Sequence, residues 1–272
     1  MKFASKLICA AGLALLASTA AQADVVINDW YFNQNGTGAA GATKVHENLD
    51  FVGQALIVLT PTSLTSFSFT EYALFGVVGH DGQPNSLPGP AWISSTFVAS
   101  GSGNFSGAFT FAAGALNVFS SLTDSSSSAY STGATNIGSF SVLPGGGGLV
   151  DGTGDPIANG QVTVHVAADT LASGYWLDQA KNDLLSSDVL AFAFTNANPI
   201  QDADPDLTVS PLCTLAGLGT DCSTAPDGSR LLFIGDNGQF KLSRIPEPAS
   251  LALVGIALIA AGATSRKRVA KR

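Results

Sequence analysis

The chain has 272 residues, of which 46% are hydrophobic and 12% are charged, and its formal net charge at pH 7 is −8. This acidic balance argues against a nucleic-acid partner, because phosphates repel a negatively charged surface. The sixteen phenylalanines argue against disorder, since they supply a core that disordered chains lack.

The N-terminus has the pattern of a secretory signal peptide. Lys2 and Lys6 precede an apolar core over residues 7–17, and the segment ends in the small-residue motif Ala21-Gln22-Ala23. We therefore expect signal peptidase to cut between Ala23 and Asp24 and the mature chain to be exported through the inner membrane.

The exported part is more acidic than the whole chain. Residues 24–245 contain five Lys or Arg against nineteen Asp or Glu, which gives a net charge of −14. Such a surface favours counter-cations and neutral or cationic partners. The length of this part is enough for one large all-β domain or two small ones.

Strands are expected along the first half of the exported part. Phe67 and Phe69 alternate with polar residues, and alternation with a period of two is typical of a strand that buries one face. A pattern of the same kind places Phe105, Phe109 and Phe111 on one face. The predicted strands of this half cover residues 25–32, 51–60, 65–75, 92–99, 104–111 and 118–122.

The second half continues in the same style. Val162, Val164 and Val166 share one face of a strand, whose other face carries His165 as a solvated residue. Residues 145–148 are all glycine and predict a flexible loop, whereas residues 175–185 fit either a helix or a turn. Further strands are expected at residues 137–143 and 190–194, and the sequence Gly235-Asp236-Asn237-Gly238 predicts a hairpin between residues 231–234 and 239–242.

Many short strands with few credible helices predict an all-β fold. We expect a β-sandwich, jelly-roll-like in arrangement, over residues 24–244. The sequence shows no internal repeat of fixed period.

Two cysteines remain in the exported part, Cys213 and Cys222. An even number of cysteines in an oxidising compartment predicts a disulfide, which here would close the loop Thr214–Asp221. A zinc site is not expected, because His46, His80 and His165 are far apart in the sequence.

No catalytic motif is evident in the sequence, and no catalytic residue is assigned. Acidic residues that meet only in the fold remain an alternative. The best local cluster is Asp202, Asp204 and Asp206, whose alternate carboxylates could converge on Ca²⁺. The competing interpretation is a solvated acidic turn, and residues 151–155 are interpreted as a flexible turn.

Three tryptophans could contact sugars. Trp30, Trp92 and Trp176 have rings that stack on sugar faces when exposed, although core packing is the expected use of each.

The C-terminus combines three features. Pro246-Glu247-Pro248 precedes an uncharged apolar run over residues 249–264, and basic residues follow over residues 266–272. The run is shorter than the roughly 20 residues of a comfortable transmembrane helix, and the basic residues would stay on the cytoplasmic side. We expect a single transmembrane sorting helix within residues 245–272.

This order of motif, short span and basic cluster resembles the PEP-CTERM sorting tail of exopolysaccharide-producing Gram-negative bacteria. The resemblance implies cutting near Pro246-Glu247-Pro248 by a membrane-embedded exosortase-type transpeptidase. It also implies a transient stay in the inner membrane and delivery to the cell surface or the medium. The alternative is an ordinary C-terminal anchor that is never cut.

A second resemblance covers the start of the exported part. The segments Asp29-Trp30-Tyr31-Phe32-Asn33, Glu47-Asn48-Leu49-Asp50 and Phe69-Thr70-Glu71-Tyr72 are similar to the opening of the flocculation-associated PEP-CTERM proteins called PepA. That family implies a non-enzymatic surface or matrix protein that promotes floc or biofilm formation together with exopolysaccharide. The alternatives are a secreted carbohydrate-binding, lectin-like protein and a polysaccharide-active enzyme.

Overall fold

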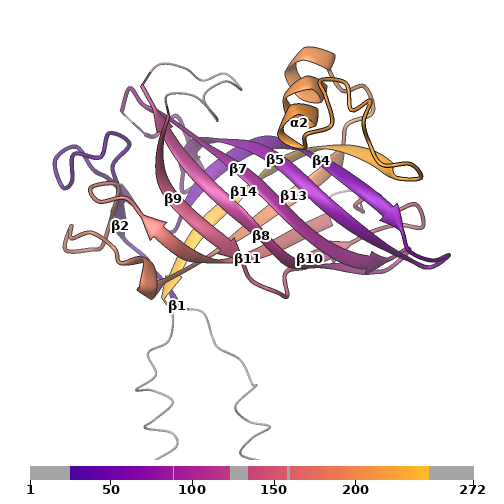
Figure 1. Ribbon diagram of the computed structural model, residues 1–272. Coiled ribbons are helices and arrows are strands. Elements are labelled where there is room, and N and C mark those ends of the chain that lie inside the picture. Colours follow the sequence, from indigo (N-terminus) through magenta and orange to yellow (C-terminus); the bar gives the residue numbers. More distant parts are fainter. Residues whose placement is uncertain (1–24, 88, 123–133, 158–159, 245–272) are drawn as a thin grey trace, which may run out of the picture. The chain divides into compact units, whose positions relative to one another are not determined.

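Long antiparallel strands make up most of the chain that the structure describes. The structure is a computed structural model in which residues 25–87, 89–122, 134–157 and 160–244 are described (Figure 1). In these residues strands dominate, and the one α-helix is the short α2 (Ser210–Leu215). The predicted all-β class is confirmed.

The main sheet closes on itself. Its strands pair antiparallel in chain order, and β14 pairs back with β4 over residues 48–59 of β4. β9 and β10 share one place between β8 and β11, each covering one end of that seam. The strands of this circuit are β4 (Asn48–Pro61), β5 (Ser66–His80), β7 (Trp92–Asn104), β8 (Ala108–Ser121), β9 (Thr135–Val142), β10 (Gly147–Leu149), β11 (Gly160–Leu171), β13 (Val189–Pro199) and β14 (Arg230–Arg244).

Period-two alternation directs the apolar side chains into the enclosed space. Phe67 and Phe69 of β5 are both buried in the main core, as are Val162, Val164 and Val166 of β11. These predicted inward faces are confirmed. Because successive side chains of a strand point to opposite faces, one register of alternation decides which residues fill the interior.

The arrangement of the strands is simpler than the jelly roll that we predicted. A jelly roll needs connections that cross between two sheets, whereas here each strand of the circuit pairs with its neighbours in the sequence. Opposite inner faces still pack against one another as they do in a sandwich, but they belong to one continuous sheet.

The predicted hairpin within residues 231–242 is wrong. β14 runs unbroken through this segment, with Asp236 opposite Gly53 and Asn237 opposite Val52 on β4. Asn237 and Gly238 do not have the positive φ that an Asn-Gly turn needs. Pairing with a long neighbouring strand outweighs the local turn preference.

Two other local predictions also need correction. The strand expected over residues 104–111 contains the turn between β7 and β8, where Ser106 has a φ of 58°. The glycines at 147 and 148 belong to β10 rather than to a loop. A Cβ atom at Gly147 would lie 1.9 Å from the carbonyl oxygen of Phe109, so close approach of the strands requires glycine there.

A small second sheet accompanies the closed one. It consists of β12 (Trp176–Leu177), β2 (Trp30–Phe32) and β3 (Thr43–Val45). Residues 175–185, which fit either a helix or a turn, thus begin with a short strand. The remaining short elements are β1 (Val25–Val26), which pairs with β14, β6 (Gln83–Pro84), which pairs with β5, and the single turns η2 (Ser186–Asp188) and η3 (Pro205–Val209).

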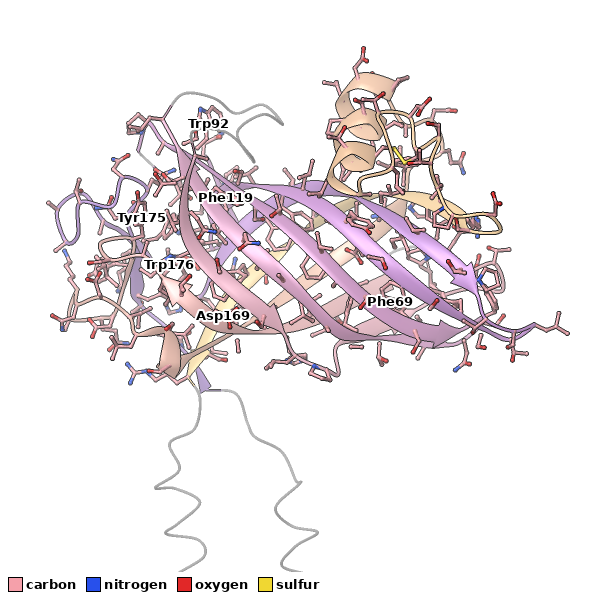
Figure 2. All side chains as sticks on the ribbon, viewed as in Figure 1. Phe69, Trp92, Phe119, Asp169, Tyr175 and Trp176 are labelled. Atoms are coloured by element: carbon pink, nitrogen blue, oxygen red, sulfur yellow. A yellow bond between two sulfur atoms is a disulfide. The ribbon has the colours of Figure 1, made fainter. Side chains whose placement is uncertain are left out.

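Aromatic side chains fill the two ends of the closed sheet. At one end, the tryptophan cluster packs the ring of Trp176 against Trp30 at 5.9 Å and against Phe32 at 4.9 Å. At the other end, the rings of Phe69, Phe109 and Phe111 in the phenylalanine cluster meet edge to face. Figure 2 shows Trp176 and Phe69 at these opposite ends. The tryptophan cluster comprises Trp30, Phe32, Phe140, Trp176 and Phe240, and the phenylalanine cluster comprises Phe67, Phe69, Phe105, Phe109 and Phe111.

A second, smaller core lies on the outer face of the closed sheet. The segment between β13 and β14 carries η3 and α2, and it lies over β4 and β5 (Figure 1). Leu212 and Cys213 of α2 pack there against Leu56 and Val58 of β4. We call this the outer core.

Residues 26–243 form one of two units into which the chain divides. Within the described ranges, no helix has both the length and the apolar composition needed to cross a membrane. The sorting helix predicted within residues 245–272 lies outside the described residues.

Candidate functional site

A groove beside the outer core has small hydroxyl side chains at five of its twelve lining residues. Its volume is about 500 Å³, and it lies over the outward faces of β4, β5 and β7. Strand pairing aligns Thr60, Ser68 and Ser102 in one row, and Thr70 and Ser100 in the next. Adjacent strands are about 4.8 Å apart, so each row presents hydroxyls at regular intervals. We call these five side chains the hydroxyl rows.

The hydroxyl rows are available to a ligand. In the described part of the chain, no side chain or backbone group hydrogen-bonds to any of the five hydroxyls. Tyr72 forms part of the groove wall, and Leu218 and Pro226 contribute from the segment that carries α2. The described lining residues bear no formal charge. Unengaged hydroxyls beside an aromatic ring suit a neutral, polyhydroxylated partner.

Trp92 is the one of the three tryptophans that core packing does not explain. Its exposed fraction is 55%, whereas Trp30 and Trp176 are buried at 0% and 1%. Trp92 begins β7, the strand that also carries Ser100 and Ser102, and Figure 2 shows its position. The prediction of core packing is therefore wrong for Trp92, whose indole is accessible to a planar apolar surface such as a sugar face.

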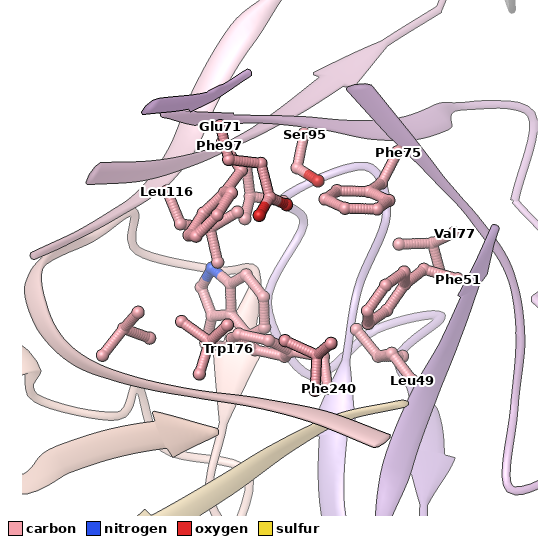
Figure 3. Close-up of a pocket in the computed structure, with 14 residues that line it drawn as sticks. Leu49, Phe51, Glu71, Phe75, Val77, Ser95, Phe97, Leu116, Trp176 and Phe240 are labelled. Carbon is pink, nitrogen blue, oxygen red and sulfur yellow. The ribbon is translucent and has the colours of Figure 1, made fainter. Parts of the chain in front are cut away.

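A cavity inside the closed sheet holds the second candidate site. It has a volume of about 60 Å³, and apolar side chains from β4, β5, β7, β8, β11, β12 and β14 line most of it. The carboxyl group of Glu71 and the hydroxyl group of Ser95 also line it, and Figure 3 shows both reaching inward among the rings of Phe75, Phe97 and Trp176.

A second carboxyl group acts on Glu71. Asp236 of β14 is 7% exposed, and its negative charge is close enough to influence Glu71. Burial, and after it the charge of Asp236, raises the pKa of Glu71 to about 8. Burial raises the pKa of Asp236 to about 7. No described residue donates a hydrogen bond to either carboxyl group.

The predicted disulfide is confirmed. The sulfurs of Cys213 and Cys222 are bonded at 2.07 Å, and both cysteines are buried in the outer core. The disulfide links the end of α2 to the loop that follows it. It therefore fixes the segment that contributes Leu218 to the groove.

The structure does not bring the three carboxylates proposed for Ca²⁺, those of Asp202, Asp204 and Asp206, together in one group. Among the described residues, no group of three or more His, Cys, Asp or Glu side chains is placed to hold a metal ion. The Asp204 carboxylate instead accepts hydrogen bonds from the backbone N–H groups of Asp206 and Leu207, at 2.9 and 2.8 Å. Asp204 thus caps the N-terminus of η3 with its carboxylate, whereas Asp202 and Asp206 are exposed.

The other polar residues considered in the sequence have local roles. Asp151 accepts the N–H groups of Thr153 and Asp155 across its turn, so this turn is ordered by its own side chain. His46 pairs with Asp29, and His80 pairs with Asp81. His165 is half-buried on β11, opposite Phe192 of β13.

The predicted processing sites lie outside the described residues. These sites are the signal-peptidase position at Ala23 and Asp24 and the sorting motif Pro246-Glu247-Pro248.

The interior carboxyl pair of Glu71 and Asp236 was not predicted from the sequence, although a signal for it was present. Glu71 follows Phe67 and Phe69 at the same two-residue interval, so alternation directs it inward. Asp236 likewise continues the inward positions of Leu232 and Ile234. Its place in an apparent turn motif concealed this regularity.

Comparisons of the chain with protein-family models, curated proteins and solved structures found no match.

Proposed function

We propose that this protein is an exported, non-enzymatic component of the cell surface or extracellular matrix that associates with exopolysaccharide and promotes floc or biofilm formation. The hydroxyl rows are the single observation that carries the proposal. They form a regular, uncharged and unengaged array beside an aromatic side chain, which is the chemistry that a neutral polysaccharide can use.

The two ends of the sequence support the route by which the protein reaches that place. In this proposal, signal peptidase removes residues 1–23, and an exosortase-type enzyme cuts near Pro246-Glu247-Pro248 after a transmembrane sorting helix has paused in the inner membrane. The acidic net charge of the exported part suits a matrix of neutral polysaccharides and counter-cations. Intact mass measurement of the secreted protein tests both cuts and detects any attached group.

The enzyme alternative has a specific difficulty. A glycosidase needs two carboxyl groups that flank a bound sugar. Of the two interior carboxyl groups that act on one another, Glu71 and Asp236, Glu71 lines a cavity of about 60 Å³, and neither lines the groove. That volume is too small for a polysaccharide chain, so this pair does not fit the role of catalytic acid and base.

The lectin-like alternative shares the groove with the leading proposal. The two differ in whether one short glycan binds tightly or a long polymer binds through many weak contacts. A glycan array measured beside binding to whole exopolysaccharide separates them. Hydrolysis of the polymer in the same samples, lost when one acidic pair is changed, would favour the enzyme.

The groove itself is tested with a variant that removes three of its hydroxyls, Thr70→Ala, Ser100→Ala and Ser102→Ala. We expect binding to exopolysaccharide from the producing cells to weaken by about tenfold or more, because each neutral hydrogen bond contributes about 0.5–1.5 kcal/mol. Thr170→Ala on β11 is the control, since Thr170 is exposed on a strand and does not line the groove.

Two results would contradict the proposal. One is unchanged polymer binding by the triple variant, or an equal loss in the control. The other is a deletion strain whose aggregation and exopolysaccharide retention match those of its parent.

A further inference from the structure

The cavity inside the closed sheet has a lining typical of a small binding site rather than of a packing defect. Residues from opposite sides of the sheet border it, and almost all of them are apolar. The tryptophan cluster closes one end of the interior, and the phenylalanine cluster closes the other. Within this apolar lining, Glu71 brings a carboxyl group and Ser95 a hydroxyl group, as Figure 3 shows.

The carboxyl group of Glu71 is not paired within the described chain. No hydrogen bond reaches it, and the charged group that acts on it is the like-charged Asp236. An isolated carboxylate is costly in an apolar interior, and a neighbouring carboxylate adds repulsion. Such a pair is stabilised either by keeping a proton or by gaining a cation that can donate hydrogen bonds.

The size and lining of the cavity limit which cation fits. Its volume of about 60 Å³ is well below that of the roughly 150 Å³ apolar cavity known to hold benzene. The apolar side chains around Glu71 suit a methyl or ethyl group, and the Glu71 and Ser95 oxygens can both accept hydrogen bonds. A large or strongly hydrated ion would lose its water without gaining enough ligands.

We propose that this cavity binds a small ammonium ion, either ammonium itself or a short primary alkylammonium, whose N–H groups donate to the Glu71 carboxylate and to the Ser95 hydroxyl. The Asp236 carboxylate adds to the attraction for positive charge from β14. This site is separate from the hydroxyl rows and does not depend on the proposed matrix function.

The test uses the full-length chain with methylammonium chloride as the probe. Melting temperature is measured at pH 8, near the pKa of Glu71, against equal sodium chloride and against methanol as a neutral ligand of similar size. We expect methylammonium alone to raise the melting temperature, because a ligand selective for the folded state stabilises it. Calorimetric titration should give at least about tenfold weaker binding for Glu71→Gln, since an ionic hydrogen bond is lost.

The control variant is Asp206→Asn, which removes an exposed carboxylate that does not line the cavity and should leave binding unchanged. If Glu71→Gln does not fold, proton release by the unaltered protein still tests whether methylammonium binds at Glu71. Methylammonium binding below the pKa of Glu71 must then release protons, which titrations in buffers of different ionisation enthalpy detect. No shift with methylammonium, an equal shift with sodium or methanol, or binding without proton release would overturn the proposal.

Discussion

The inside and the outside of the closed sheet are stabilised in different ways. The interior has a large aromatic cluster at each end, and its side chains come from strands distributed along the whole chain. The outer core has few fully buried residues, and two of them are the cysteines of the disulfide. A large core can rely on apolar burial, whereas a small one gains more from a covalent link.

This difference also separates the two candidate sites. The hydroxyl rows lie outside, next to a segment fixed by the disulfide, and they face solvent. The Glu71 cavity lies inside and depends on the aromatic clusters that close the interior. Variants that weaken one core should therefore leave the other site largely intact.

The largest expected effect is the loss of the indole at the centre of the tryptophan cluster. Trp176 is 1% exposed, contacts several rings and donates a hydrogen bond from Nε1 to the Ile137 carbonyl at 2.7 Å. We expect Trp176→Ala to lower the free energy of unfolding by about 3–5 kcal/mol, as for other buried aromatic truncations. Urea denaturation measures this.

The exposed Trp92 provides the matched control. We expect Trp92→Ala to change the free energy of unfolding by no more than about 0.5 kcal/mol, because its ring is mostly in solvent. Equal losses in the two variants would show that the tryptophan cluster has no special part in closing the interior.

The next effect concerns the interior carboxyl pair, Glu71 and Asp236, and its dependence on pH. The folded pKa values of Glu71 and Asp236, about 8 and about 7, lie above the ordinary values of 4.5 and 3.8. Between about pH 4 and pH 8 the folded state therefore holds more protons than the unfolded state, and stability falls as pH rises through that range. Each group lowers the free energy of unfolding by at most about 1.4 kcal/mol per pH unit over this range.

Glu71→Gln should reduce this pH dependence. The amide stays neutral, so at pH 9 we expect the variant to be more stable than the parent by about 2–4 kcal/mol, and at pH 4 the two should be similar. Urea denaturation over this pH range measures the difference. A parent protein whose stability is flat or rises between pH 5 and pH 8 would show that the pair is not buried as described.

The contrast between inside and outside also explains how much the sequence could predict. The inward faces of β5 and β11 followed from alternation, because Phe67, Phe69 and the valines of β11 repeat every second residue. The disulfide followed from the number of cysteines and the expected compartment. These features depend on local patterns or on composition.

The features that the sequence did not predict depend on non-local pairing. The Gly-Asp-Asn-Gly segment has a strong turn preference, yet pairing with β4 keeps it extended and places Asp236 inside. Closure of the sheet between β4 and β14 joins strands from opposite ends of the domain, which no local pattern encodes. The hydroxyl rows likewise exist only once β4, β5 and β7 are in register.

In the outer core, the disulfide should stabilise mainly the segment around α2. Cys213 and Cys222 are separated by nine positions, and closing so short a loop contributes roughly 2–3 kcal/mol. We expect the double variant Cys213→Ser, Cys222→Ser to lose about that much stability in the segment around α2. Hydrogen exchange should show faster exchange there and unchanged protection in β8 and β11.

The same change should weaken exopolysaccharide binding only if the segment around α2 helps to shape the groove. Reducing agent provides a control, because it should reproduce the effect in the parent protein and do nothing further to the variant. Loss of protection throughout the closed sheet would contradict the separation between the two cores.

The smallest expected effect is that of an ion pair on the surface. The Arg230 guanidinium at the start of β14 donates to both oxygens of the Asp155 carboxylate, at 2.9 and 2.7 Å, and so ties the turn at residues 151–155 to the sheet. Both partners are partly exposed, so we expect Arg230→Ala to cost at most about 1 kcal/mol and the difference to shrink as salt is added. Urea denaturation at low and high salt measures it. A loss of several kcal/mol that salt does not reduce would mean that this turn belongs to the interior core rather than to the surface.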